Sequence, residues 1–170
     1  MAAEIVVLDA AAATSADELA SVLTDCVNGG ASVSFMHPFH QADGVEFFRT
    51  VIAAVERGDT VLIAARDGER IVGAVQLGLD TPPNQPHRAE IKKLLVHRAM
   101  RKRGIGEALM ARAEQEAKAR GRTLLVLDTA SGDAERLYER SGWQRTGVIP
   151  DYALWPGGGF CDTTIFWKRL

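Results

Sequence analysis

The feature that most constrains this chain is a strand-like run followed by a basic loop and two glycines at the start of a helix. The run is Glu90–Val96, the loop is His97–Arg103, and Gly104 and Gly106 open a segment, 104–120, with apolar residues at helical spacing. Glycine lets the backbone approach a ligand closely, and the free N–H groups and dipole of a helix N-terminus favour an anion. The segment therefore predicts a pocket that accepts a pyrophosphate.

Positive charge gathers in this loop although the chain as a whole has a formal net charge of −2. The basic side chains are Arg98, Arg101, Lys102 and Arg103. The overall charge argues against general capture of nucleic acid and does not exclude a local basic pocket. A solvated basic turn between a strand and a helix is the alternative interpretation, and charge alone does not decide between the two.

Two other phosphate-binding motifs fit this segment poorly. A Walker loop needs Gly-Lys-Ser/Thr, and Glu107 stands where the lysine should be. A dinucleotide fingerprint needs a glycine directly after the strand and another three residues after Gly106, where Leu109 stands instead. Neither motif describes the loop.

The order of predicted elements indicates an α/β fold. With 170 residues, 46% of them hydrophobic, the chain suits one domain over residues 1–170. Strands are expected at 5–8, 60–65, 70–79, 88–96, 123–127, 143–148 and 163–168, and helices at 15–27, 42–57, 104–120 and 133–140. The turn Asp67-Gly68-Glu69 favours an antiparallel hairpin, and Ser15 with Glu18 predicts a capping box.

Cysteine usage and hydropathy indicate the compartment. Cys26 and Cys161 lie far apart, outside any metal-ligand spacing, so we expect neither a disulfide nor a metal site. The histidines also match no ligand spacing. No run approaches the roughly 20 apolar residues of a membrane span, and the first residues do not resemble a signal peptide. We expect a cytoplasmic protein that engages neither membrane nor nucleic acid.

Two motifs resemble those of the Gcn5-related N-acetyltransferases. Residues 101–106, Arg-Lys-Arg-Gly-Ile-Gly, match the family's coenzyme A motif Arg/Gln-x-x-Gly-x-Gly/Ala. Residues 134–143 resemble its Ala-x-x-Leu-Tyr-x-x-x-Gly-Phe motif. The resemblance implies acetyl-CoA as cofactor and a mixed, mostly antiparallel sheet, flanked by helices, with splayed parallel fourth and fifth strands. The cofactor-binding residues it implies are Leu94, Leu95, Val96, Arg101, Lys102, Arg103, Gly104, Ile105, Gly106 and Ser131.

Ser131 departs from the family pattern, because many members carry asparagine three residues before the alanine of the second motif. This leaves the role of Ser131 open. Within the family, the closest likeness is to the tabtoxin resistance acetyltransferases, through residues 29–33, 88–90, 127–129 and 163–166. That likeness suggests an amino-acid-like acceptor.

The same resemblance implies a catalytic set. Glu90 and Asp128 would deprotonate the acceptor ammonium, directly or through water, and Tyr138 would protonate the leaving thiolate. A backbone N–H near Leu95 or Val96 would stabilise the oxyanion. The alternatives are structural: Glu90 pairing with a neighbouring base such as Lys92 or Arg88, and Tyr138 packing on Trp143.

Aromatic side chains near the glycine run 157–159 are candidates for the walls of an acceptor pocket. They are Phe35, Tyr152 and Trp155, for which plain packing is the alternative. We expect the acceptor to be a small-molecule amine. A sensor that binds coenzyme A without turnover, and an enzyme that acetylates proteins or peptides, both remain open. An edge strand near the C-terminus would allow pairing into a homodimer.

Overall fold

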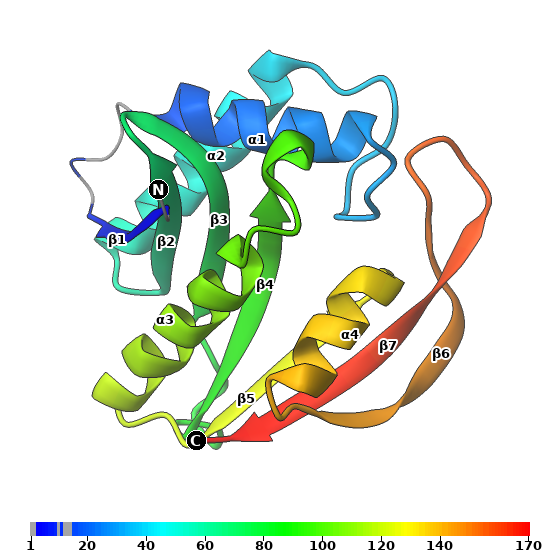
Figure 1. Ribbon diagram of the computed structural model, residues 1–170. Helices are drawn as coiled ribbons and strands as arrows, with labels where there is room; N and C mark the ends of the chain where they lie inside the picture. The colour runs from blue at the N-terminus through cyan, green and yellow to red at the C-terminus, as the bar shows by residue number, and fades with distance from the viewer. Residues whose placement is uncertain (1–2, 10, 12–14) are drawn as a thin grey trace.

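The computed structural model describes residues 3–9, 11 and 15–170. These residues form a seven-stranded sheet of order β1-β2-β3-β4-β5-β7-β6 with helices on both faces (Figure 1). The strands are β1 (Glu4–Leu8), β2 (Thr60–Asp67), β3 (Arg70–Gly78), β4 (Arg88–Val96), β5 (Leu124–Thr129), β6 (Gln144–Leu154) and β7 (Phe160–Arg169). The helices are α1 (Ala16–Asn28), α2 (Gln41–Glu56), α3 (Ile105–Ala119) and α4 (Gly132–Arg140), with a 3₁₀ turn, η2, at Arg98–Met100.

The sheet is antiparallel except between β4 and β5, as the resemblance predicts. These two parallel strands are paired only from Arg88 opposite Leu124 to Glu90 opposite Val126. Beyond that point they diverge, with α4 in front of the opening (Figure 1). The predicted fold, with its splayed fourth and fifth strands, is therefore confirmed.

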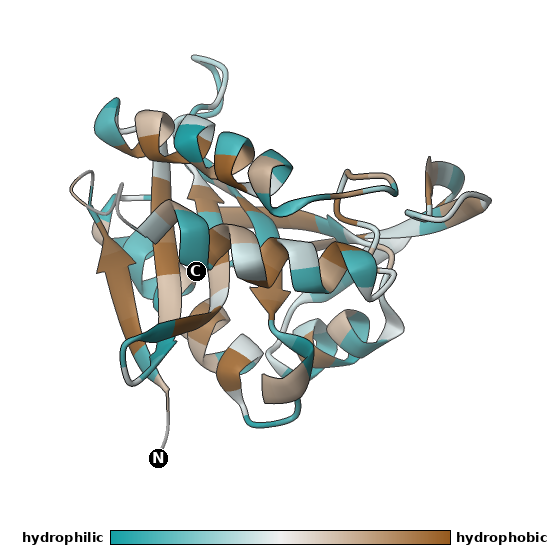
Figure 2. Cartoon of the chain, turned by 90° about the horizontal axis from the view of Figure 1, so that it is seen from above, coloured by the Kyte–Doolittle hydropathy of each residue, from teal (hydrophilic) through white to brown (hydrophobic). Residues whose placement is uncertain are grey.

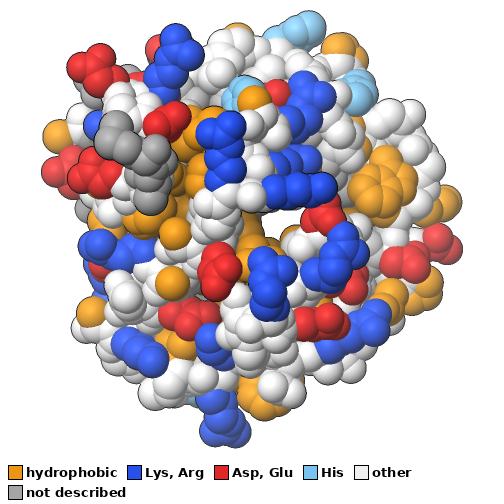
Figure 3. All heavy atoms as spheres, in the orientation of Figure 1, with side chains coloured by type: hydrophobic (Ala, Val, Ile, Leu, Met, Phe, Trp, Pro, Cys, Tyr) orange, Lys and Arg blue, Asp and Glu red, His pale blue; other side chains and the backbone are white. Residues whose placement is uncertain are grey.

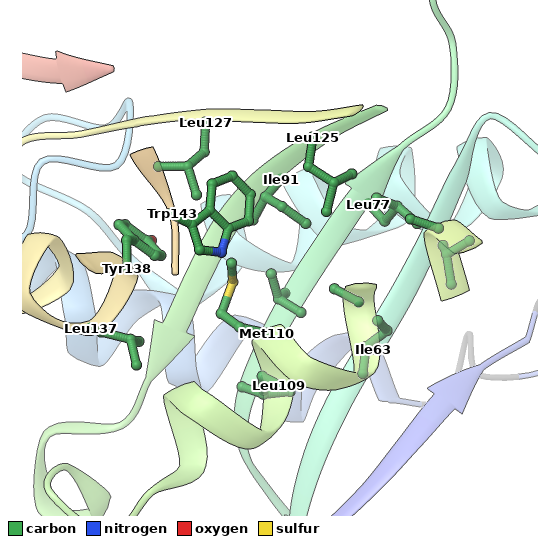
Figure 4. Packing of buried hydrophobic residues seen from close by; sticks show 14 of the residues in the cluster. Ile63, Leu77, Ile91, Leu109, Met110, Leu125, Leu127, Leu137, Tyr138 and Trp143 are labelled. Atoms are coloured by element: carbon green, nitrogen blue, oxygen red, sulfur yellow. The ribbon is translucent and has the colours of Figure 1, made fainter. Parts of the chain in front are cut away.

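Each face of the sheet has its own apolar core. Apolar residues of α3 and α4 pack on one face, with Leu109, Met110 and Trp143 fully or almost fully buried (Figure 4). Apolar residues of α1 and α2 pack on the other. Because both faces are covered, β2 and β3 are buried along most of their length and are rich in hydrophobic residues (Figure 2). The sheet is thereby fixed on both sides, which holds the gap between β4 and β5 in place.

A bulge interrupts β4 just where this gap opens. Opposite Val75, between the pairs Leu95–Ala74 and Lys92–Gln76, β4 has two residues, and one of them, Lys93, has φ 51°. In an unbroken strand all odd-numbered residues point to one face. Here Ile91 packs in the α3–α4 core and Leu95 in the α1–α2 core. The extra residue therefore reverses the facing of the strand's last residues.

Two expectations differ from the structure. The strands β6 and β7 form a hairpin that is longer than the predicted runs 143–148 and 163–168, because exposed residues from Ile149 to Leu154 continue β6 without a hydrophobic alternation. The capping box is also wrong. Ser15 makes no side-chain capping bond, and the Glu18 carboxylate instead accepts a 2.8 Å hydrogen bond from the Ile71 N–H, which ties α1 to β3.

None of the helices in the described part of the chain combines the length and the apolar composition needed to cross a membrane. Both cysteines, Cys26 and Cys161, are buried and free. Among residues 3–9, 11 and 15–170, no group of three or more His, Cys, Asp or Glu side chains is placed to hold a metal ion.

Candidate active site

A cavity of about 950 Å³ lies between the diverging strands β4 and β5 and reaches the N-terminus of α3. Figure 3 shows this face hollowed near its centre, with Lys and Arg side chains along the rim. The cavity lining includes the three predicted catalytic residues, Glu90, Asp128 and Tyr138. It also includes every predicted cofactor-binding residue except Arg103, which is exposed outside it.

The N-terminus of α3 is shaped by two kinds of glycine. Gly104 caps the helix with φ 77°, a conformation that costs other residues energy. Gly106 lies in the first turn, where a Cβ would come within 3.2 Å of the Leu137 side chain on α4. The absence of a side chain there keeps α3 and α4 close while leaving the first-turn N–H groups accessible from the cavity. This end of α3 can accept an anion.

Two of the four basic side chains of the loop are engaged by the protein itself. Arg101 donates from Nε to the Val96 carbonyl at 3.2 Å and approaches the Cys26 sulfur at 3.9 Å. Arg98 donates from its backbone N–H and from Nε to the two carboxylate oxygens of Asp25, at 2.8 and 3.0 Å. Arg98 therefore fastens the loop to α1 and Arg101 fastens it to the end of β4. Arg101 and Lys102 both line the cavity.

Asp25 holds this loop from the C-terminal part of α1. Burial raises its pKa, but the two Arg98 hydrogen bonds and the nearby charges of His97 and Arg98 outweigh burial, so the pKa is lowered overall. Gly29 makes room for the Arg98 side chain, because a Cβ on residue 29 would lie 2.6 Å from the Cδ of Arg98. No local pattern predicts this role of Asp25, since its partner Arg98 is 73 residues away.

The end of β4 presents a backbone donor to the gap. The His97 N–H donates to the Val72 carbonyl of β3, and Leu95 is paired with Ala74. Backbone groups of alternate residues point in opposite directions within a strand, so the Val96 N–H points away from β3, toward the diverging β5. Of the two predicted oxyanion donors, Val96 rather than Leu95 faces the cavity.

The two carboxylates reach the same face of the sheet. Leu127 of β5 packs in the α3–α4 core, so the neighbouring Asp128 faces the α1–α2 side, as Glu90 does on β4. Asp128 accepts a 2.8 Å hydrogen bond at Oδ2 from the Thr163 hydroxyl. Glu90 lies 3.5 Å from the Lys92 ammonium, so the pairing along the strand that the sequence left open is present.

Tyr138 approaches the gap from the opposite face. Tyr138 is 4% exposed, and its ring packs against Trp143 with ring centroids 5.9 Å apart (Figure 4). It also packs against Phe166, at 5.6 Å between centroids. Burial, reinforced by the negative charge of Asp128, raises the pKa of the Tyr138 phenol well above its ordinary value. The packing of Tyr138 on Trp143, the structural alternative, is therefore present. The same side chain also lines the cavity, where its raised pKa keeps the phenol protonated.

A second cavity of about 310 Å³ adjoins the first. Phe35 and Tyr152 line it, whereas Trp155 lines the larger cavity. The two cavities share the wall formed by Asp128, Thr129 and Ala130 of β5 and its end, together with Ser32 and Ser34.

Backbone strain is concentrated around these cavities. Among the described residues, the non-glycine residues with positive φ are Ser34, Lys93, Lys102 and Asp151. Ser34, Lys93 and Lys102 line the larger cavity, and Asp151 precedes Tyr152 of the smaller one. Strained backbone of this kind is found most often at functional sites.

Sequence reasoning missed Lys93 and Ser34, which are joined by a 2.8 Å hydrogen bond from the Lys93 ammonium. The available signal was the doublet Lys92-Lys93 in a strand covered on both faces. Neighbouring residues of a regular strand point to opposite faces, so one of two adjacent lysines would point into an apolar core. A bulge avoids this because it lets both side chains point to the same face. The doublet therefore pointed to the bulge.

Comparison with known proteins agrees with this geometry. Residues 30–143 match the acetyltransferase (GNAT) family. The chain belongs to the GNAT family. By family it is an acetyl-CoA-dependent acetyltransferase, which is the chemistry that the motif at residues 101–106 predicts.

Relatives of this GNAT protein include acetyltransferase Atu2258 of Agrobacterium fabrum, 44% identical over 59 residues that cover 35% of this chain and 43% of that protein. The match thus spans less than half of the Agrobacterium protein. The IAA acetyltransferase of Azospirillum brasilense is 29% identical over 116 residues, covering 67% of this chain and 74% of its own.

Among solved structures, yncA of Salmonella typhimurium with its cofactor acetyl-CoA superposes with a TM-score of 0.80 at 17% identity, over 100% of this chain and 95% of that one. At this identity the likeness establishes the fold.

The serine at the family's usual asparagine position has a structural role. Ser131 is the N-cap of α4, and its hydroxyl accepts a hydrogen bond from the Ala134 N–H at 3.4 Å. Serine is among the preferred residues at this position. The serine therefore caps α4, the helix that carries Tyr138.

Proposed function

We propose that this GNAT protein transfers the acetyl group of acetyl-CoA to the amine of a small molecule. One observation carries the proposal: two adjoining cavities meet at Asp128, one suited to a long phosphate-bearing cofactor and the other to a small acceptor. The larger cavity ends at the anion-accepting N-terminus of α3. The smaller one is near the lower limit of ligand-binding pockets, about 300 Å³.

In the proposed mechanism the two carboxylates prepare the acceptor. Asp128, oriented by the Thr163 hydroxyl, takes a proton from the ammonium of the acceptor, directly or through water. Glu90 adds negative charge on the same face and favours binding of the cationic acceptor. The neutral amine then attacks the thioester carbonyl through the gap between β4 and β5.

Two groups on the cofactor side complete the transfer. The Val96 N–H points into the gap and donates to the carbonyl oxygen as negative charge develops there. Tyr138 would give its proton to the thiolate sulfur as the carbon–sulfur bond breaks, and the proton that the acceptor nitrogen loses on forming the amide would return the phenolate to a phenol. Its raised pKa keeps the phenol protonated, so it is ready to act as an acid throughout the physiological pH range.

The lining of the smaller cavity favours a small acceptor over a protein chain. Phe35, Met36 and Tyr152 give it apolar walls, and Asp128 and Asp162 provide its acidic groups. An amino-acid-like acceptor, as in the tabtoxin resistance group, fits a cavity of this size.

A free-thiol release assay with acetyl-CoA and a panel of amines tests the proposal. The panel includes β-lactam amino acids, aminoglycosides, polyamines and short peptides. We expect turnover with small amines and a fall of about 10²- to 10⁴-fold in the Asp128→Asn variant, whose side-chain oxygen still accepts from Thr163. A Lys118→Met variant, altered on the exposed surface of α3, is the control.

The rival function is a sensor that binds coenzyme A without turnover. Calorimetry separates the two: tight acetyl-CoA binding with no thiol release from any amine would replace the enzyme by the sensor. Turnover confined to peptides would instead favour a protein N-acetyltransferase.

A further inference from the structure

The bulge residue Lys93 brings a cation into the acceptor side of the site. Its ammonium donates to the Ser34 hydroxyl at 2.8 Å and lies 5.9 Å from the centre of the Phe35 ring. Ser34 lines both cavities and Phe35 lines the smaller one. The ammonium is therefore located near the junction of the two cavities.

This cation is left without a carboxylate partner of its own. The neighbouring Lys92 pairs with Glu90, whereas Lys93 takes part in none of the ion pairs within 4.0 Å among residues 3–9, 11 and 15–170. An ammonium has three donors, and the structure accounts for one of them, the bond to Ser34. Burial lowers the pKa of Lys93, and the opposing effect of the negative charge of Asp128 is smaller. The surroundings therefore do not fully replace the hydration that the ammonium loses.

Maintaining this arrangement has a cost. Both partners of the hydrogen bond have left-handed backbone, Ser34 with φ 80° and Lys93 with φ 51°. Such conformations are unfavourable for non-glycine residues and persist where the surrounding structure imposes them. Two of them joined by one hydrogen bond hold the ammonium in a fixed position beside the acceptor cavity.

The same face of the sheet therefore offers two opposite charges to one acceptor. Asp128 lines both cavities, and the Lys93 ammonium lies close enough for the charge of Asp128 to act on it. We propose that Lys93 binds the carboxylate of a zwitterionic acceptor, an amino-acid-like amine, whose ammonium is turned toward Asp128. This inference rests on the proposed function and names the substrate class of that site.

The experiment compares pairs of acceptors that differ only in the anionic group, each amino acid with its own carboxamide. Thiol release gives kcat/KM for both members of a pair. In the wild type we expect the acid to be preferred. Lys93→Met keeps most of the side-chain volume and removes the charge, and we expect it to lower kcat/KM for the acid by about 10- to 100-fold with little change for the amide.

Two further variants separate the binding of an anion from simple tethering of the loop. Ser34→Ala removes the hydrogen bond and keeps the cation, so the preference for the acid should persist. Lys93→Arg should retain part of the preference. Equal losses for acid and amide in Lys93→Met, or a wild type that does not distinguish the two, would overturn the inference while leaving the acetyltransferase proposal intact.

Calorimetry with the coenzyme A-loaded protein distinguishes the remaining cases. If no amine is turned over but amino acids bind and Lys93→Met abolishes that binding, the Lys93 inference stands and the proposed enzymatic function falls. If amino acids are neither turned over nor bound, both are wrong.

Discussion

Replacing Tyr138 by phenylalanine removes one hydroxyl and keeps the ring that packs between Trp143 and Phe166. The loss of a single hydroxyl changes stability by at most about 0.5–1.5 kcal/mol. If the phenol protonates the leaving thiolate, the same change removes a general acid, which is worth about 10²- to 10⁴-fold in rate. At 1.36 kcal/mol per decade this raises the barrier by roughly 3–5 kcal/mol. Activity should therefore fall far more than stability.

The assay is thiol release at saturating acetyl-CoA, with the cofactor affinity measured separately by calorimetry. We expect kcat to fall by the factor above and the Kd of acetyl-CoA to change less than about twofold, because the ring that borders the cavity is kept. Since the pKa of Tyr138 is raised, the wild-type rate should show no loss of this acid between pH 7 and about pH 10.

The raised pKa also gives a stability signature with a defined sign. Above about pH 10 the unfolded chain loses the phenolic proton that the folded protein keeps, so the folded state binds more protons and its stability falls as pH rises. Tyr138→Phe has no phenol to titrate. Above pH 10 the free energy of unfolding measured with urea should therefore fall less in the variant than in the wild type. A variant with unchanged kcat would refute the acid role, and a pH-independent difference would refute the raised pKa.

Two other contacts give predictions for the scaffold of the site. Asp25→Asn should lower the free energy of unfolding by about 1–2 kcal/mol and weaken acetyl-CoA binding, because Arg98 is released. Folding lowers the pKa of Asp25, so the stability difference between wild type and variant should be fully present above about pH 4. It should disappear as the pH falls through the pKa of Asp25 in the folded protein. A difference that is unchanged at pH 2 would contradict the role of the Asp25 carboxylate. Lys168→Met should cost roughly 2–3 kcal/mol in chemical denaturation, because the ammonium donates to both Glu114 oxygens and to the Ser141 carbonyl; an unchanged midpoint would show that this network contributes nothing.

Local sequence signals predict the helices, most of the strands and the glycine-marked start of α3, whereas the splayed parallel pair β4–β5 is expected from the family resemblance. Gly104 has a positive φ, and Gly106 lies where a Cβ would come close to Leu137 on α4. Glycine suits both positions because it has no side chain, so the residue type alone indicates them. Apolar periodicity places the helices and most strands within a few residues. Tyr138 lies on α4, so its position follows once that helix is known.

The acceptor side depends on contacts between distant residues, which local patterns do not encode. Thr163 orients Asp128 from 35 residues away, and Ser34 meets Lys93 from 59 residues away. The extension of β6 through Tyr152 has no hydrophobic alternation, because its residues are exposed and are held by pairing with β7. Such features become visible only when the sheet is assembled.

The bulge in β4 explains how the predicted groups can act together although they lie on opposite faces of a sheet. Asp128 faces the α1–α2 side, and Tyr138 belongs to the α3–α4 core. A closed sheet would separate a base on one face from an acid on the other. The gap between β4 and β5 removes that barrier, and the bulge turns Lys93 toward the acceptor side while the Val96 N–H still points into the gap. In the proposed mechanism, one inserted residue therefore lets a single strand serve both the acceptor and the cofactor.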